Sequence, residues 1–174
     1  MEKIYLLLMD SHTVPSKIIK AFTGYPYSHV GIALEPHCNV MYSFGRRRVH
    51  SIFNSGFTAG RKNGEFFTAF HRTMCRIYEI EVSDEQYAQL KETLTAMLTD
   101  KEAYRYDMIG IVPRFFGVPF TRKNRYVCSY FVAELLEKAG VHRFDKPVCL
   151  IQPSDFEALK DCKEIYSGYY RLYP

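Results

Sequence analysis

Two β-prone runs early in the chain constrain the fold more than any other feature of the sequence. Residues 28–34 read SHVGIAL and residues 39–45 read NVMYSFG, with only EPHC between them. A connection this short joins antiparallel neighbours, so the pattern predicts a β-hairpin. Successive side chains of a strand point to opposite faces, which places His29, Gly31 and Ala33 on one face of the first strand.

Further strands and helices place the chain in the α+β class. Alternation and β-propensity predict strands at 3–9, 73–82, 163–168 and 169–173. Helical spacing and capping residues predict helices at 14–22, 84–98, 103–111, 125–140 and 153–159. Capping boxes are predicted from Ser83 in SDEQ and from Ser154 to Glu157, and the helix after Ser83 is expected to place Tyr87, Leu90, Leu94, Met97 and Leu98 on one face. The polar, glycine-rich stretch 46–72 is predicted to be a long loop, with room for a short strand, that is mobile or borders the cleft. We expect an antiparallel sheet that packs against these helices.

Composition favours one globular domain spanning residues 1–174, because 47% of the residues are apolar and 24% are charged. The formal net charge of +4 permits an anionic partner without requiring one. The apolar run IYLLLM is too short for a transmembrane segment and does not resemble a signal peptide, so a cytoplasmic location is expected. The five cysteines lack CxxC spacing, which indicates reduced thiols and no metal site. No cofactor motif is present.

Cys128 differs from the other cysteines because it lies in the first turn of the predicted helix at 125–140. The upstream residues TRKNRY add three positive charges. A helix N-terminus and nearby cations lower the pKa of a thiol and so favour the nucleophilic thiolate. The alternative is a small, inert residue, since free cysteines are commonly buried. A thiolate nucleophile needs a general base, and His29, beside the small residues Gly31 and Ala33, is the best placed histidine.

These two segments together resemble a known family. YSHVGIAL early in the chain and YVCSYFVAELLEKAG late in it look like the circularly permuted branch of the NlpC superfamily of papain-like cysteine hydrolases. Lecithin–retinol acyltransferase-like enzymes share this permuted order, in which the histidine strand precedes the cysteine helix. The segments YRYDMIG and IQPSDFEAL are also similar to family segments. The resemblance covers most of the chain and implies a permuted papain-like fold.

The resemblance also implies roles for individual residues. Cys128 matches the nucleophile, His29 the general base, and Tyr106 a tyrosine that helps to hold the oxyanion. The residue that orients the histidine falls on Ser43, which can accept a hydrogen bond but lacks the charge of a carboxylate. The other polar candidates near this position along the chain are Glu35, Asn39 and His50.

The expected activity is hydrolysis of an amide or ester in a small molecule, peptide or lipid, through an acyl-enzyme on Cys128. Lipid acyl transfer is one alternative. A low-turnover ligand-binding protein on the same fold is another, and the uncharged third residue favours it. The aromatic segments RFFGVPF and SIFNSGF are candidates for an acyl or aromatic pocket.

Binding to nucleic acid or to an anionic membrane through GRRRVH and AGRKNG ranks below these hypotheses. Basic clusters of this size usually form a solvated face, and no nucleic-acid-binding motif accompanies them. No nucleic-acid partner is therefore expected.

Overall fold

The computed structural model describes residues 1–12, 14–49 and 51–174. Its described residues form an α+β structure with one mostly antiparallel sheet of eight strands, in the order β7-β6-β4-β3-β2-β1-β5-β8. The strands are β1 (Glu2–Asp10), β2 (His29–Ala33), β3 (Val40–Arg48), β4 (Ser51–Arg61), β5 (Met74–Val82), β6 (Arg105–Tyr106), β7 (Arg125–Tyr126) and β8 (Cys162–Tyr169). The short pair β6 and β7 is parallel, and the other pairs are antiparallel.

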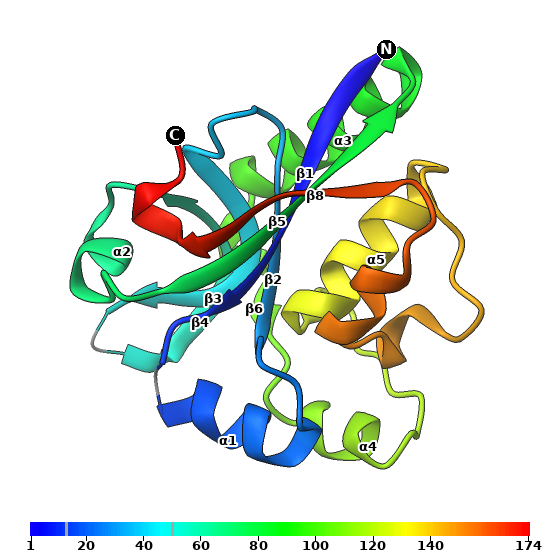
Figure 1. Ribbon diagram of the computed structural model, residues 1–174. Coiled ribbons are helices and arrows are strands. Elements are labelled where there is room, and N and C mark those ends of the chain that lie inside the picture. The colour runs from blue at the N-terminus through cyan, green and yellow to red at the C-terminus, as the bar shows by residue number, and fades with distance from the viewer. Residues whose placement is uncertain (13, 50) are drawn as a thin grey trace.

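Helices surround this sheet on both faces and at one end (Figure 1). The α-helices are α1 (Val14–Thr23), α2 (Glu65–Ala69), α3 (Asp84–Thr99), α4 (Ile111–Phe115) and α5 (Cys128–Lys138). Short 3-10 helices follow at Lys101–Ala103, Val148–Leu150, Pro153–Ala158 and Tyr170–Leu172. In Figure 1, α1 and α4 lie at the lower end of the sheet, while the chain termini lie at the opposite end. None of the described helices has the length and apolar character needed to cross a membrane.

The first strand is apolar on both faces because it contributes to two cores. Ile4, Leu6 and Leu8 join the main core, which α3 and α5 cover. The alternate residues of β1 join a smaller core on the other face of the sheet, with Phe67 of α2 and Tyr170 near the C-terminus. A strand in the middle of a sheet with both faces covered must be apolar at nearly every position, which explains the run IYLLLM.

The predicted hairpin is confirmed. Strands β2 and β3 are antiparallel, and Ile32 pairs with Tyr42. Val30 and Ile32 face the main core, while Ala33 faces the smaller core together with Met41 of β3. Since side chains alternate, the face that carries Ala33 also carries His29 and Gly31, as predicted.

The helix after Ser83 begins with the predicted capping box. The hydroxyl of Ser83 accepts from the backbone N–H of Gln86, and the Gln86 side chain accepts from the backbone N–H of Ser83. Leu90, Leu94 and Met97 are buried as expected, but Leu98 is 37% exposed, so its assignment to the buried face is wrong.

The prediction of a long loop at 46–72 is wrong. Strand β3 continues to Arg48, β4 follows over Ser51–Arg61, and a short helix begins at Glu65. Glycines in this stretch had suggested a loop, yet Gly56 is a strand residue. A Cβ there would collide with the carbonyl oxygen of Tyr104, because strand β6 pairs directly with it. Only glycine permits this close approach of two backbones.

Three other expectations are wrong near short elements. The segment 103–111 contains strand β6 and a turn before α4, in place of a helix. The second capping box uses Gln152 and Asp155, two residues before the predicted pair Ser154 and Glu157. The end of the chain turns into a 3-10 helix at Tyr170–Leu172, so the predicted strand at 169–173 does not form.

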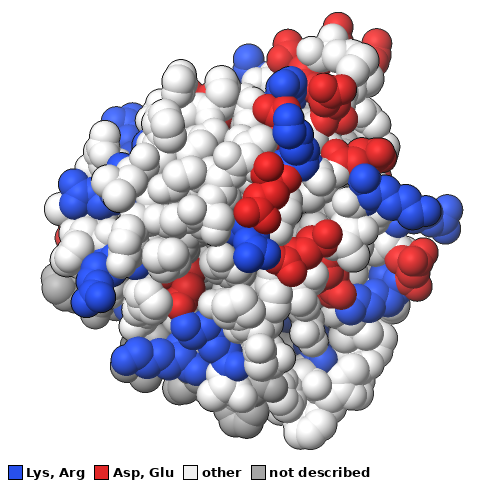
Figure 2. Space-filling model, viewed as in Figure 1, with Lys and Arg blue, Asp and Glu red and all other residues white. Residues whose placement is uncertain are grey.

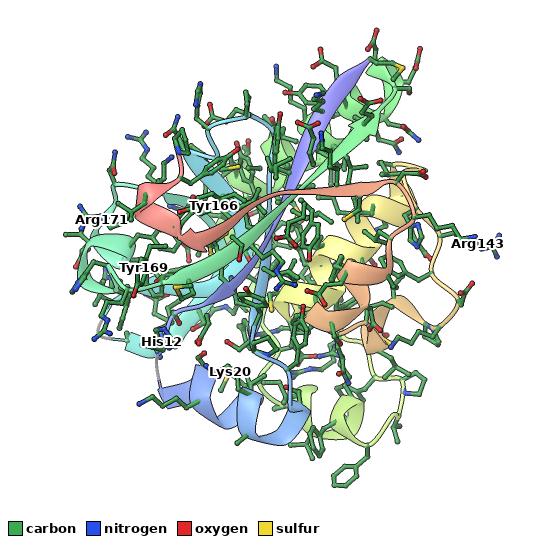
Figure 3. All side chains as sticks on the ribbon, in the orientation of Figure 1. His12, Lys20, Arg143, Tyr166, Tyr169 and Arg171 are labelled. Atoms are coloured by element: carbon green, nitrogen blue, oxygen red, sulfur yellow. The ribbon has the colours of Figure 1, made fainter. Side chains whose placement is uncertain are left out.

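Helix α1 is tied to the end of β1 by the buried carboxylate of Asp10. The Ser16 hydroxyl donates to it at 2.5 Å and the backbone N–H of His12 at 2.9 Å, and Lys20 forms an ion pair with it. His12 and Lys20 converge on this junction (Figure 3). Burial alone would raise the pKa of Asp10, but these hydrogen bonds hold it below its ordinary value.

Candidate active site

Cys128 lies in the first turn of its helix, as the sequence predicts, and its side chain is almost fully buried. The predicted helix start at residue 125 is wrong, because Arg125 and Tyr126 form strand β7 and α5 begins at Cys128. No side chain caps this helix end, so the first backbone N–H groups of α5 have no capping partner. The N–H groups of Val30, Ser129 and Cys128 itself are directed at the sulfur and lower its pKa. Burial outweighs them, however, and the pKa of the Cys128 thiol is raised. The expectation of a low pKa is therefore wrong, and the resting group is a neutral thiol.

His29 opens strand β2, and its imidazole is held by Ser43 of the neighbouring strand. The Ser43 hydroxyl lies 2.9 Å from Nε2 of His29 and 2.6 Å from the carbonyl oxygen of Val30. A carbonyl oxygen can only accept, so the single hydroxyl proton of Ser43 points at Val30. The contact with His29 then requires Nε2 to be the donor. This tautomer leaves Nδ1 unprotonated and available as a base.

Burial lowers the pKa of His29 to about 4, so the imidazole is neutral at pH 7. The ring lies over Gly45 of β3: a Cβ at that position would come within 3.4 Å of Cε1. A larger side chain would displace the imidazole. Sequence reasoning credited the room around the ring to Gly31 and Ala33, and it missed Gly45, which is two residues beyond Ser43 on the same face.

Val30 links the two predicted reactive groups. Its backbone N–H faces the Cys128 sulfur, and its carbonyl accepts from Ser43. Within the described part of the chain, no hydrogen bond joins the thiol of Cys128 to the imidazole of His29. The thiol therefore adjoins Val30, the residue that follows His29 in the chain. Ser43 hydrogen-bonds both to the Val30 carbonyl and to the His29 imidazole.

Tyr106 lies in β6, close to the other site residues. Its pKa is raised, first by burial and second by the nearby Cys128. Tyr106 and His29 line the same cavity, whose volume is about 390 Å³. The phenol is therefore neutral and can donate a hydrogen bond to an anionic oxygen.

A buried ion cluster beside Tyr106 was not assigned from the sequence. Asp107 is fully buried, accepts from Arg114 at 2.8 Å and from Nε of Arg122 at 3.0 Å, and also accepts from the backbone N–H of Gly110 at 3.2 Å. Burial would raise the pKa of Asp107, but these donors hold it below its ordinary value. A Cβ on Gly110 would overlap the carboxylate. The cluster fixes the chain on the C-terminal side of Tyr106.

The cavity is bordered by much of the stretch 46–72, so that part of the loop prediction is confirmed. Its wall combines apolar side chains with four arginines: Met9, Ile19, Met41, Phe44, Phe66, Phe67, Met108, Ile111, Arg46, Arg47, Arg48 and Arg61. The segment RFFGVPF contributes nothing to this wall, because Phe115 and Phe116 are 50% and 75% exposed. Of the segment SIFNSGF, Ser55 lines the cavity, while the side chains of Ile52 and Phe53 lie outside the described residues.

The basic runs are not simply a solvated face. Arg47 forms an ion pair with Glu102 at 2.6 Å and donates to the carbonyl oxygen of Tyr104 at 2.8 Å. Lys62 is buried and donates to the carbonyl oxygens of His37 and Tyr173 at 2.8 and 3.0 Å. Two of the cations in these runs therefore hold the structure together.

The other candidates for the third position differ in what the structure shows of them. Glu35 accepts from the backbone N–H of Val40 at 3.2 Å, and Asn39 is exposed. His50 lies outside the described residues. Among the described candidates, the hydrogen bond to His29 comes from Ser43.

Solved structures include a counterpart of this fold. The crystal structure of metalloprotein yiiX from Escherichia coli O157:H7, DUF1105, is similar over 97% of this chain and 98% of that chain, with a TM-score of 0.53 and 15% sequence identity. At this identity the likeness concerns the fold alone. No protein-family model and no curated protein matches the sequence.

Proposed function

We propose that this chain is a cysteine hydrolase that cleaves amide or ester bonds through an acyl-enzyme on Cys128, on a permuted papain-like fold. One observation carries the proposal. The hydrogen bonds of Ser43 fix the tautomer of His29 in which Nδ1 is unprotonated and basic. His29 is also the neighbour in the chain of Val30, whose backbone N–H faces the Cys128 thiol. The chain order, with the histidine strand before the cysteine helix, supports the permuted fold.

The reaction begins from neutral partners. The raised pKa of Cys128 and the lowered pKa of His29 keep the thiol and the imidazole uncharged at rest. As the sulfur attacks the substrate carbonyl carbon, a carbon–sulfur bond forms, the carbonyl oxygen takes up the negative charge, and the thiol proton passes to Nδ1 of His29. No hydrogen bond joins the two groups in the described structure, so this step requires the imidazole to approach the sulfur in the substrate complex. Positive charge on the imidazole and negative charge on the carbonyl oxygen then develop while the carbon–sulfur bond forms, so a resting thiolate is not required.

The oxygen of the tetrahedral intermediate needs donors that are already in position. The backbone N–H groups at the start of α5 are suited to this, because helix N-terminal amides have no intrahelical partner. The Tyr106 hydroxyl is a further donor. The imidazolium of His29 next protonates the leaving amine or alcohol as its bond to carbon breaks. A thioester remains on Cys128.

The group that attacks the thioester determines whether the enzyme hydrolyses its substrate or transfers the acyl group. His29 takes a proton from water, whose oxygen attacks the thioester carbon and releases the acid and the thiol. An alcohol or amine in place of water would make the enzyme an acyltransferase. The substrate class extends over small molecules, peptides and lipids, and the cavity beside His29 and Tyr106 is the candidate binding site.

A metal is not part of the proposed reaction. The yiiX structure is named as that of a metalloprotein. In the residues described for this chain, no three His, Cys, Asp or Glu side chains gather as ligands, and His29 is bonded to a serine. This donor set does not fit a metal ion, and no step is routed through one.

The second candidate is a ligand-binding protein with little turnover. The burial of Cys128, which is 5% exposed, and its raised pKa favour it. Both candidates use the same cavity, so ligand binding does not separate them. Covalent chemistry at Cys128 does.

Acylation of Cys128 by carbonyl electrophiles of several acyl-chain lengths tests the proposal. Intact-mass analysis and peptide mapping should find one acyl group on Cys128 that is released slowly by water. Cys128→Ala should abolish the adduct, and His29→Ala should reduce it at least a hundredfold. Cys149→Ala is the matched control, because Cys149 is also 5% exposed but lies outside the site. Equal labelling of all cysteines, or none at Cys128, would refute the hydrolase and favour the ligand-binding protein.

A further inference from the structure

The segment 108–118, MIGIVPRFFGV, places its apolar side chains outward. The exposed fractions are 56% for Met108, 65% for Ile109, 62% for Val112, 50% for Phe115, 75% for Phe116 and 52% for Val118. Most other large apolar side chains of the described chain are buried or half-buried. A run of exposed apolar residues of this kind marks an interaction surface on a protein.

The orientation of this segment is fixed, so exposure is not a consequence of a loose loop. Arg114 turns inward, is 9% exposed, and pairs with the buried carboxylate of Asp107. The backbone closes on itself, since Gly117 N–H donates to the carbonyl of Arg114 and Val118 N–H to that of Pro113. The segment therefore buries its cation and exposes its phenylalanines, the reverse of the usual distribution in water.

The exposed charged side chains in the segments that carry and flank this apolar surface are cations. No Asp or Glu occurs in residues 108–133, which contain Lys123 and Arg125. Arg114 and Arg122 also lie in this range, but both pair with the buried Asp107. Residues 11–34, which include α1, also lack acidic side chains and contain the exposed Lys17, while Lys20 pairs with the buried Asp10. Helices α1 and α4 border the same cavity through Ile19 and Ile111. Cations beside exposed apolar side chains complement a surface with anionic groups over an apolar interior.

The view in Figure 2 shows the same distribution. Acidic side chains gather toward the top and middle of this face. The lower end, where α4 lies in Figure 1, is uncharged, and basic side chains lie beside it at lower left. Basic side chains also lie elsewhere on this face, but no acidic side chain is seen at its lower end, where α4 lies.

We propose that the segment 108–118 docks this protein on anionic lipid bilayers, with Ile109, Val112 and Phe116 inserted below the headgroups and lysines of the surrounding segments at the headgroup level. Because Met108 belongs both to this surface and to the cavity wall, docking places the cavity beside the bilayer. Docking does not depend on the reactivity of Cys128, so it stands or falls independently of the proposed hydrolase.

Tryptophan fluorescence tests insertion directly, because the chain has no tryptophan of its own. Phe116→Trp should shift its emission to the blue with vesicles of 70% phosphatidylcholine and 30% phosphatidylglycerol, and brominated lipid should quench it. Leu172→Trp is the matched control, since Leu172 is 72% exposed but lies in the 3-10 helix Tyr170–Leu172, which Figure 1 shows on a different side of the molecule from α4. The control should show neither effect.

Vesicle co-sedimentation measures the contribution of each group. Ile109→Ser combined with Phe116→Ser should weaken partitioning at least tenfold, and Leu172→Ser should change it less than twofold. Lys17→Gln and Lys123→Gln should each weaken it about fivefold. Lys91 is an exposed residue of α3, and Lys91→Gln should have no effect on partitioning.

Three results would overturn the proposal: no binding to these vesicles, equal binding to pure phosphatidylcholine, or equal loss in the control variants. Circular dichroism would confirm that each variant is folded. Cys128→Ala should bind vesicles like the unaltered protein. A failure of the hydrolase proposal would therefore leave this result unchanged.

Discussion

Ser43→Ala perturbs the imidazole of His29 without touching the thiol. Alanine removes the hydroxyl that lies 2.9 Å from Nε2 and 2.6 Å from the Val30 carbonyl oxygen, and keeps the Cβ. Nε2 then loses the acceptor that selects its protonated form. Both tautomers of the neutral ring become populated, and only one of them has a basic Nδ1.

The size of the effect follows from the kind of bond that is lost. One neutral hydrogen bond contributes roughly 0.5–1.5 kcal/mol, so acylation of Cys128 should slow by a factor of about ten at most. Because Ser43 is fully buried, its former partners have no access to water. The free energy of unfolding should fall by about 1–3 kcal/mol.

Nitrogen NMR of the histidine side chains reports the tautomer. In the unaltered protein the His29 signals should show a protonated Nε2 and an unprotonated Nδ1, and His29→Gln identifies those signals. Ser43→Ala should move both nitrogen shifts toward an average of the two forms. Thr58→Val is the matched control, because Thr58 of β4 pairs with Ser43 of β3 and its hydroxyl donates to the Ser43 backbone carbonyl.

The reasoning is refuted if Ser43→Ala leaves the tautomer unchanged. It is also refuted if a folded Ser43→Ala loses all acylation, as Cys128→Ala should. In the second case the hydroxyl would do more than orient the ring. An equal change of the His29 nitrogen shifts in Thr58→Val would also refute it, because any change in the β3–β4 pair would then alter the tautomer.

Three further outcomes follow from the buried charges and thiols. Asp107→Ala leaves Arg114 buried without its carboxylate and should lower the free energy of unfolding by about 3 kcal/mol; a loss below 1 kcal/mol in urea denaturation would contradict this. The pKa of His29 is about 4 in the folded chain and 6.5 in the unfolded chain, so the unfolded chain binds more protons between these values. The free energy of unfolding should therefore fall by about 3 kcal/mol as pH falls from 6.5 to 4, and His29→Gln should lose this component in urea titrations at the two pH values. Alkylation of Cys128 by iodoacetamide should be slow at pH 7 and rise above pH 9, because burial raises the thiol pKa; a rate that is already constant at pH 7 would show a resting thiolate.

Local patterns predicted the elements that carry the candidate site. The hairpin of β2 and β3 and the start of α5 at Cys128 follow from alternation and helical spacing, which depend on neighbouring residues alone. The side of β3 that holds Ser43 follows from strand parity. These features could be predicted because the buried face of a strand or an amphipathic helix appears in the sequence as apolar residues at a regular spacing.

The extent of strand β4 was not predicted, because its glycines are required by contacts with residues that lie far along the chain. Gly56 is needed where β6 approaches, and that approach depends on Tyr104, far along the chain. Residue composition within the stretch 46–72 contains no trace of this partner, so the glycines favoured a loop. Arg47 was likewise assigned to solvent, whereas Glu102 and Tyr104 enclose it.

The sequence by itself determined which residues can react: a cysteine at the start of a helix, a histidine at the start of a strand and a serine on the adjoining strand. Only the tertiary structure decided their protonation. A helix N-terminus acts within one turn and lowers a thiol pKa, but burial depends on every segment packed around the sulfur, and it raises the pKa of Cys128 and lowers that of His29. The tautomer of the imidazole depends on the Ser43 hydroxyl donating a hydrogen bond to the Val30 carbonyl, a contact that exists only once the two strands are paired.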